Sequence, residues 1–195
     1  MPKAGRQIYD GAICHIIQRG NNRQEIFKED QDYKKFLSII KGYKWVYPFE
    51  IYNYCLMRNH IHLLIKIPTA KDLAKIMQGI FQSFRFYFGK KYNYAGYLYQ
   101  GRFKSKLIEK DEYLLECARY IERNPLRAGI AADLKEYRWI SYGFYAYGLR
   151  DKLITPNPLY LALSSDTKKR RRLYEEYIFG SRIYEEIVDR EFKIQ

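Results

Sequence analysis

The sequence predicts an α+β fold: a ferredoxin-like split β-α-β sheet with helices on one face, followed by a mostly helical C-terminal extension. Three observations lead to this class. Hydrophobic patterns follow one another as strand, helix, strand, strand, helix, strand between residues 12 and 109. The clearest strand has one unbroken apolar row, as a half-buried sheet requires. The chain of 195 residues can fill one core. We expect a main domain over residues 1–145 and a basic helical extension over residues 146–195.

The first strand and helix follow from the spacing of their apolar residues. The strand spans Ala12 to Arg19 and ends at the turn-forming Gly20-Asn21-Asn22. A helix then begins near Asp30 or Asp32, because acidic residues suit a first helical turn. Its apolar stripe falls at i, i+3, i+4 and i+7: Tyr33, Phe36, Leu37 and Ile40.

A hairpin follows, with strands over Glu50–Leu56 and His60–Ile67. Successive side chains of a strand point to opposite faces, so His60 and His62 share one face, about 7 Å apart along the strand. Neutral imidazole is the commonest metal ligand, so the pair is a candidate half of a metal site. Its alternative interpretation is a structural pair without such a role. We interpret His15, in the first strand, as structural or as a neighbour of the pair.

A long helix begins after Thr69, which suits the N-cap position, with Asp72 in the first turn. Its apolar stripe consists of Leu73, Ile76, Met77, Ile80 and Phe84, and the segment from Gly89 to Gly96 breaks the pattern. Another face carries Gln78, Gln82 and Arg85. The simpler interpretation assigns these three side chains to solvent, and the alternative assigns them to nucleic acid.

The fourth strand, Leu98 to Glu109, carries basic side chains on one face: Arg102, Lys104 and Lys106. If the apolar rows face the helices, these side chains share the open face of the sheet with the histidine pair. A further helix starts at Asp111, and Pro125 ends it because proline has no N–H and disfavours helix in the residue before it. Its core stripe consists of Leu114, Cys117, Ala118 and Ile121.

The composition indicates an anionic partner. There are 35 Lys and Arg against 22 Asp and Glu, a net charge of +13, and 17% of the residues are aromatic. Cations and stacking rings together suit single-stranded nucleic acid, although structural nucleic-acid binders share this composition. The three cysteines form no CxxC, which favours buried thiols in a reducing compartment. No apolar run has the length of a membrane span, and Met1 to Gly11 has no signal-peptide core, so we expect a cytoplasmic protein.

Four segments together form a recognisable series. They are residues 14–21 (CHIIQRGN), 56–64 (LMRNHIHLL), 99–105 (YQGRFKS) and 119–129 (RYIERNPLRAG), and WISY at residues 139–142 and RRLY at 171–174 extend them. This series resembles the single-tyrosine transposases of the HUH superfamily, especially the REP-associated tyrosine transposases. HUH denotes two histidines around a hydrophobic residue, here His60-Ile61-His62. One departure is Arg58, where proline is the usual residue of the family.

The resemblance implies a metal-dependent nuclease and strand transferase that acts on single-stranded DNA, often at hairpin-flanked ends. The nucleophile of the family maps to Tyr120, and its metal ligands map to His60, His62 and Asn124. The implied metal is Mg²⁺ or Mn²⁺. Tyr120 and Asn124 lie one helical turn apart, on one face of the helix, which agrees with the resemblance. Tyr113, two turns before Tyr120, is the alternative nucleophile.

DNA-binding residues are expected in two places. The first group lies on the sheet: Arg19, Arg102, Lys104 and Lys106. The second is the run Lys168, Lys169, Arg170, Arg171 and Arg172, which is either a solvated face or a grip on DNA phosphates. The resemblance leaves open a monomer or a domain-exchanged homodimer, the DNA sequence, and whether the protein moves an element.

Two other classes share parts of the pattern. A non-catalytic single-strand binder would explain charge, aromatics and fold, but it would not need His60, His62 and Tyr120 together. A replication initiator or relaxase-type nickase would share the chemistry, but normally brings a larger chain. Metal-dependent nicking separates the first class from a transposase, and strand joining helps to separate the second.

Overall fold

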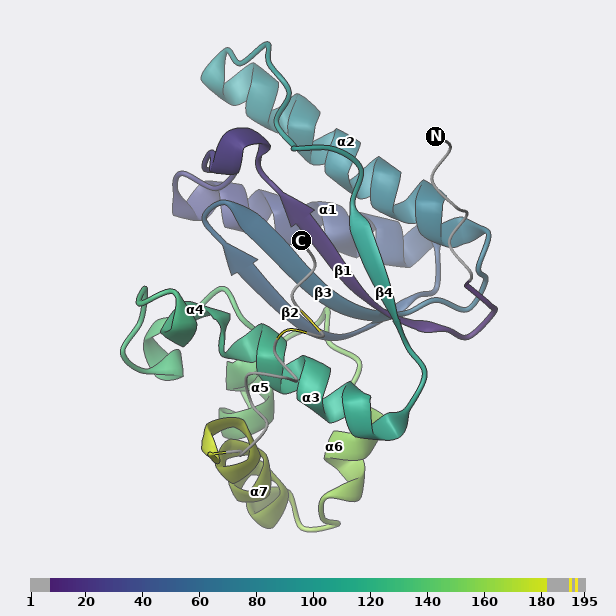
Figure 1. The fold of residues 1–195 in the computed structure, drawn as a ribbon, viewed down its shortest axis with the longest axis vertical. Coiled ribbons are helices and arrows are strands. Elements are labelled where there is room, and N and C mark those ends of the chain that lie inside the picture. The colour runs from purple at the N-terminus through teal and green to yellow at the C-terminus, as the bar shows by residue number, and fades with distance from the viewer. Residues whose placement is uncertain (1–7, 182–189, 191, 193–195) are drawn as a thin grey trace.

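The computed structural model describes residues 8–181 together with Arg190 and Phe192, so most of the N-terminal stretch considered for a signal peptide lies outside the described residues. Four strands form one antiparallel sheet in the order β2-β3-β1-β4 (Figure 1). Their bounds are Ile13–Arg19 (β1), Glu50–Met57 (β2), His60–Lys66 (β3) and Lys104–Ile108 (β4). The predicted fold class and the predicted order of elements are confirmed.

The helices lie on both sides of this sheet. Those before β4 are α1 (Asp30–Val46) and α2 (Asp72–Tyr92), with the short turn η1 (Asn21–Arg23) after β1. After β4 come α3 (Asp111–Glu122), α4 (Asn124–Arg127), η2 (Leu134–Glu136), α5 (Tyr142–Tyr147), α6 (Pro158–Ala162) and α7 (Thr167–Phe179). In Figure 1, α1 and α2 lie together on one side of the sheet, and α3 to α7 lie on the other. The sequence predicted that the second face of the sheet is open. That prediction is wrong, because α3 crosses and covers this face.

Four boundaries differ from the prediction by more than one residue. α2 begins at Asp72 with Lys71 at the N-cap position, so Thr69 does not cap it. The other three differences each have a local reason. β4 begins at Lys104, because residues 98–103 make only a single bridge, from Tyr99 to Gly20. α2 continues past Gly89 to Tyr92, and the C-cap Asn93, with a φ of 49° in the left-handed region, terminates it. Pro125 does not end helical structure: it occupies the first turn of α4, where a missing N–H costs nothing.

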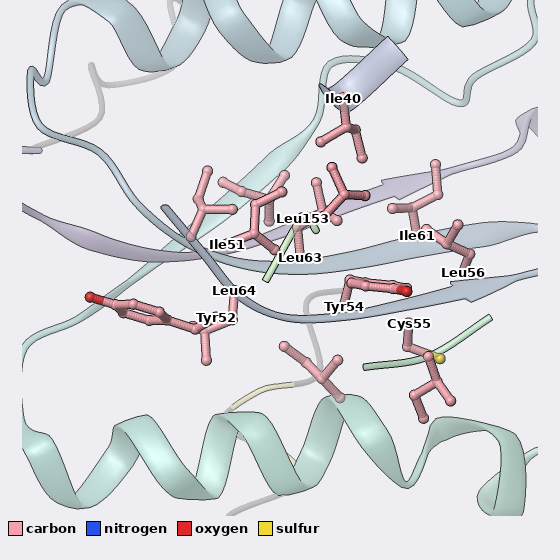
Figure 2. Close-up of a cluster of buried hydrophobic side chains, with 14 of the residues drawn as sticks. Ile40, Ile51, Tyr52, Tyr54, Cys55, Leu56, Ile61, Leu63, Leu64 and Leu153 are labelled. Carbon is pink, nitrogen blue, oxygen red and sulfur yellow. The ribbon is translucent and has the colours of Figure 1, made fainter. Parts of the chain in front are cut away.

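The core between the sheet and α1 and α2 follows the strand alternation. Ile61 and Leu63 of β3 are fully buried and point toward Ile40 of α1 in Figure 2. Leu64 and Cys55 belong to the opposite face and are also fully buried, since α3 covers them. Both faces of the hairpin β2–β3 are thus buried in the core. This packing on two sides fixes the position of β3, the strand that carries the histidine pair.

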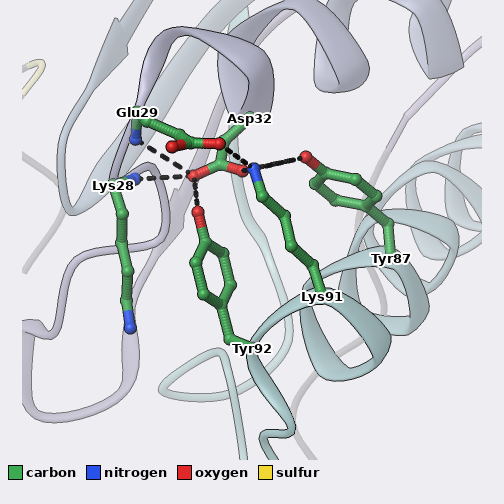
Figure 3. A network of polar contacts seen from close by, with 6 residues as sticks. All are labelled: Lys28, Glu29, Asp32, Tyr87, Lys91 and Tyr92. Atoms are coloured by element: carbon green, nitrogen blue, oxygen red, sulfur yellow. Dashed lines mark hydrogen bonds and ion pairs between the residues drawn. The ribbon is translucent and has the colours of Figure 1, made fainter.

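A buried carboxylate fixes α1 against α2. Asp32 has a side chain with no exposed surface, and Figure 3 shows the groups around it. Its oxygens accept from Lys91 (2.6 Å), Tyr92 (2.7 Å) and Tyr87 (2.9 Å) of α2 and from the backbone amides of Lys28 and Glu29. Burial raises the pKa of Asp32, but these donors outweigh it and lower the pKa below its usual value. Asp32, predicted as an acidic residue of the first turn, therefore also makes tertiary contacts that join α1 to α2.

Within the described residues, no helix combines the length and the apolar character that crossing a membrane requires.

Candidate active site

The histidine pair lies at the start of β3, on the face that α3 covers. In the sheet register, His62 lies opposite Ile17 of β1 and His60 lies opposite Arg19. Residues directly opposite each other in an antiparallel pair share a face, so the Arg19 side chain belongs to the histidine side. The register therefore places the side chains of His60, His62 and Arg19 on one face of the sheet.

His15 contacts His62 directly. The distance from His15 Nε2 to His62 Nδ1 is 2.9 Å, and the two rings stack with centroids 5.2 Å apart. Burial, with a smaller effect of Lys106, lowers the pKa of His15 to about 3, and burial also holds the pKa of His62 well below its usual value. Both rings are therefore neutral at physiological pH, the form that binds a cation.

The tautomer of His62 decides which nitrogen is free. If His62 Nδ1–H donates to His15 Nε2, the lone pair of His62 Nε2 remains available, and His15 Nδ1 carries the other proton. His15 Nδ1 is buried and has no hydrogen-bond partner in the described chain. This arrangement, in which a second side chain holds the non-ligating nitrogen, is typical of metal-binding histidines. His15 would then be a neighbour of the His60–His62 pair that orients His62 without being a ligand itself, one of the two interpretations that the sequence offered for it.

His60 is oriented in the same way. Its Nδ1 lies 2.6 Å from Asn59 Oδ1, an acceptor, so Nδ1 carries the proton and Nε2 the lone pair. Asn124 lies within hydrogen-bonding reach of the His60 ring. The Asn124 amide nitrogen donates to the carbonyl oxygens of Tyr120 (2.8 Å) and Ile121 (3.1 Å), so its oxygen, not its nitrogen, is the atom that can face His60 and a cation. Burial, then Arg19, lowers the pKa of His60 to about 4.

These atoms fit a divalent cation. Two imidazole lone pairs and one amide oxygen would be the protein ligands, and the remaining positions would be left to water and phosphate oxygens. Within the described residues, no three His, Cys, Asp or Glu side chains are arranged so that they could hold a metal ion by themselves, so the set depends on the asparagine. Such nitrogen and oxygen ligands suit Mn²⁺, or Mg²⁺ that keeps several of its waters.

The Tyr120 ring packs against the rings of His15 and His62. Its ring centroid is 5.8 Å from that of His15 and 5.8 Å from that of His62, and 8% of the residue is exposed. Burial raises the pKa of the Tyr120 hydroxyl, and the nearby Arg127 guanidinium opposes that shift. Arg127 lies above the ring, 4.9 Å from its centroid. The Tyr120 phenol is thus in contact with the Arg127 guanidinium and with the imidazoles of His15 and His62.

Tyr113 does not share this position. It belongs to the first turn of α3, seven residues and about 10 Å of helix before Tyr120, and it is 43% exposed. The helix face alone could not separate the two tyrosines, because both lie close to the apolar stripe. The structure brings Tyr120, and not Tyr113, against the histidine rings.

The sequence did not identify three groups around Tyr120. Arg127 follows it by seven residues, two helical turns, and that spacing was a usable signal. Phe192 packs against Tyr120 and His15 with centroids 5.8 and 6.3 Å away, which no local pattern indicates. Glu122 is an acidic residue beside the apolar stripe of α3, an irregularity in that stripe that could have marked it.

Glu122 is the centre of a buried polar network. Its carboxylate accepts from Ser141 (2.7 Å), Asn53 (2.8 Å) and Tyr174 (2.9 Å). Burial raises its pKa to about 7, and the three donors limit that rise. The network ties the turn of α3 that holds Tyr120 to β2 and to α7. It therefore helps to fix the height of the phenol above the sheet.

The expected DNA-binding residues divide between two surfaces. Lys104 and Lys106 of β4 share the histidine face by register, Lys106 opposite His15 and Lys104 opposite Ile17, and Arg102 lies exposed just before the strand. The run over residues 168–172 is in α7, where Lys168, Lys169 and Arg172 are exposed. Arg170 is partly structural, because it donates to the Ser164 carbonyl (3.0 Å).

Comparison with known proteins gives the family. A family model described as "Transposase IS200 like" matches residues 9–124, more than half of the chain. The chain belongs to the IS200-like transposase family. The matched span contains the histidine pair and Tyr120, and it ends at Asn124. The family membership that the resemblance implied is confirmed, and it places the chain among the DNA-processing enzymes.

Two relatives agree with this assignment. A Haemophilus influenzae protein named as a candidate REP-associated tyrosine transposase is 31% identical over 108 residues, which cover 49% of this IS200-like chain and 60% of that protein. A solved structure of a REP-associated tyrosine transposase, bound to a REP hairpin, aligns with a TM-score of 0.64 at 20% identity. The alignment covers 80% of this chain and 93% of that one, and at this identity it shows a shared fold.

Proposed function

We propose that this IS200-like transposase nicks and rejoins single-stranded DNA, with Tyr120 as the nucleophile. The observation that carries the proposal is the contact of the Tyr120 ring with the His15–His62 pair. A buried tyrosine against two neutral imidazoles, beneath an arginine, is an arrangement suited to phosphoryl transfer. An ordinary boundary aromatic would need none of these neighbours.

The step balances as an exchange of phosphoesters. The Tyr120 oxygen forms a bond to phosphorus, the bond from phosphorus to the 3′ oxygen breaks, and that oxygen leaves as a 3′-hydroxyl after it receives a proton. The product is a 5′-phosphotyrosine. Attack by a 3′-hydroxyl on this ester reverses the exchange and joins strands, so no external energy source is needed.

His60, His62 and Asn124 would hold Mg²⁺ or Mn²⁺. When bound, such an ion supplies charge that stabilises the phosphate oxygens as negative charge develops. The phenol proton must be lost before attack, and Arg127 above the ring favours the phenolate form. Glu122 and its partners hold the Tyr120 turn in place while the bond forms.

The substrate we propose is a single strand that carries a hairpin. The solved relative is described as bound to a REP hairpin, and Arg19, Arg102, Lys104 and Lys106 offer this chain cations beside the histidine face. The Haemophilus influenzae relative is matched over only 60% of its length, so we propose its activity for this chain and do not infer it from the match alone. The residues 168–172 would hold phosphates farther along the strand.

A metal-dependent nicking assay tests the proposal. The full chain is incubated with Mn²⁺ and a library of single-stranded hairpins labelled at both the 5′ and the 3′ end, and the products are separated under denaturing conditions. We expect cut strands and a protein-linked labelled species, both lost when EDTA removes the metal. DNA binding without nicking under all metal conditions would instead support the non-catalytic binder.

A further inference from the structure

A cavity of about 430 Å³ lies on the other side of the sheet from the histidines, where α2 meets the segment before β4. Cavities of this size are typical of small-ligand sites. Aromatic and polar side chains from three separate segments line it. They are Gln18 at the end of β1, Gln78, Phe81, Gln82 and Arg85 of α2, and Tyr99, Arg102 and Phe103 before β4.

Among the lining residues, the buried Tyr99 hydroxyl and the Gln18 amide oxygen lack a hydrogen-bond partner within the described residues. Gln18 is 3% exposed, and its amide nitrogen donates to the Gly101 carbonyl oxygen at 3.1 Å. Its amide oxygen makes no hydrogen bond within the described residues, yet it is not sealed from solvent. A nearly buried acceptor at a cavity wall is suited to receive a hydrogen bond from a ligand.

The remaining walls suit a nucleotide. Phe81, Tyr99 and Phe103 form an aromatic side, with the rings of Phe81 and Tyr99 5.6 Å apart, and a base can pack against such rings. Gln78 and Gln82 are exposed at the rim and can pair with base edges. Arg85 and Arg102 bring positive charge for a phosphate.

β1 contributes residues both to the cavity and to the candidate active site. Gln18 and Arg19 are consecutive in β1, so their side chains lie on opposite faces of the sheet. Gln18 reaches the cavity, and Arg19 lies opposite His60 in the register. β4 is the edge strand of the sheet, and Arg102 and Lys104 are exposed along that edge. A single strand that rounds this edge would pass from one site to the other.

We propose that this cavity binds one unpaired nucleotide of the DNA strand that Tyr120 cuts, with the base inside and its phosphate at Arg85 and Arg102. The inference rests on the proposed function for its ligand. It gives Gln78, Gln82 and Arg85 a contact with nucleic acid, the alternative that the sequence had left open for them. It also makes the cavity a point of base selection, because glutamine amides pair differently with each base edge.

Photo-crosslinking locates the base. Random single strands of about 12 nucleotides, a length that can span both sites, carry 5-iodo-pyrimidines or 8-bromo-purines. They are irradiated with the Tyr120→Phe variant in EDTA, so that binding is read without cleavage. We expect crosslinks on peptides that contain Phe81 or residues 99–103. Crosslinks confined to other peptides would overturn the inference. So would a free halogenated mononucleotide that crosslinks there as efficiently as the strand.

A cavity-filling variant gives the matched test. A Cβ at Gly101 would meet no atom within 4 Å, so Gly101→Leu can project into the cavity mouth without disturbing the fold. Gly42 in α1 is equally unobstructed and does not line the cavity, so Gly42→Leu is the control. We expect Gly101→Leu to weaken single-strand binding about tenfold and to abolish the crosslink, whereas Gly42→Leu changes neither.

A second pair of variants reads the amides. Gln82→Ala removes a rim amide, and Gln31→Ala removes an exposed amide from α1, away from the cavity. We expect Gln82→Ala alone to reduce the crosslink yield several-fold. If Gly101→Leu and Gln82→Ala both bind and crosslink the strand as well as the wild-type protein, the inference is contradicted. Persistent nicking would then leave the proposed function intact. No single-strand binding by any variant would contradict the proposed function itself.

Discussion

His60 and His62 each have one ring nitrogen engaged by another side chain, Asn59 Oδ1 for His60 and His15 Nε2 for His62. The opposite nitrogen of each ring is thereby prepared for a cation. The two residues differ in burial: His60 is partly exposed, whereas His62 is 3% exposed and packs against Tyr120. Their truncation should therefore have the same chemical effect and different effects on stability.

His60→Ala should remove metal-dependent cleavage while the fold is kept. We expect a fall in cleavage rate of at least about 100-fold, with a Tm within about 2 °C of wild type. His62→Ala should also lose cleavage, but it leaves the buried His15 without its partner and should cost about 1–3 kcal/mol of stability. Denaturation curves beside a nicking assay check both, and wild-type cleavage by His60→Ala would place the metal elsewhere.

At the scale of elements, local patterns predicted what is locally determined. The alternation of His60–Ile67 predicted the buried apolar row of β3, because the period of two is a property of the strand itself. It did not predict that Leu64 and His62, on the other face, are buried too. The four predicted stripe residues of α3 are buried. The stripe did not predict that Arg119, Tyr120 and Glu122 are buried as well, or that the helix crosses the second face of the sheet. The partners of Glu122 lie 19, 52 and 69 residues away, so no local pattern could reveal them.

Asp32 allows a test of how α1 is held to α2. Asp32→Asn should cost about 3 kcal/mol, because it removes the charge that Lys91 and two tyrosines surround. The folded pKa of Asp32 is lowered, so its contribution is present above the unfolded pKa of about 4 and is lost as pH falls through the folded value. The difference between wild type and variant should therefore shrink below about pH 4.

Urea denaturation at neutral and acidic pH measures that difference. Asp30→Asn is the matched control, since Asp30 lies in the same helical turn and, among the residues that the structure describes, makes only an exposed ion pair with Arg138. We expect the control to change stability by less than about 0.5 kcal/mol at any pH. Equal losses in the two variants would show that Asp32 is no stronger a tie than a surface pair.

At the scale of the whole molecule, the C-terminal helices complete the fold. Tyr174 of α7 reaches Glu122, and Tyr145 and Tyr160 pack together with ring centroids 4.8 Å apart across the proposed boundary at residue 145. The division into residues 1–145 and 146–195 stays a prediction. Its first part contains the whole candidate site except Phe192, and its second part contains the basic run.

Charge in α7 should contribute to affinity without choosing the sequence. Lys168→Gln with Lys169→Gln should weaken single-strand binding and reduce the slope of log K against log salt by about 1.4, two phosphate contacts at about 0.7 each. Lys34→Gln with Lys41→Gln makes the same charge change at exposed positions of α1 and should leave the slope unchanged. Titrations at several salt concentrations measure both, and an altered choice of cut sequence would mean that α7 reads bases.

The central claim is that Tyr120 becomes covalently joined to DNA. The most direct measurement is mass spectrometry of the trapped adduct, with Tyr120→Phe and Tyr113→Phe as paired variants that each lose one hydroxyl from α3. Tyr120→Phe keeps the ring that contacts His15 and His62, so folding and DNA binding should survive. We predict an adduct on the Tyr120 peptide alone, lost in Tyr120→Phe and kept in Tyr113→Phe. An adduct on Tyr113, or normal cleavage by Tyr120→Phe, would contradict the account.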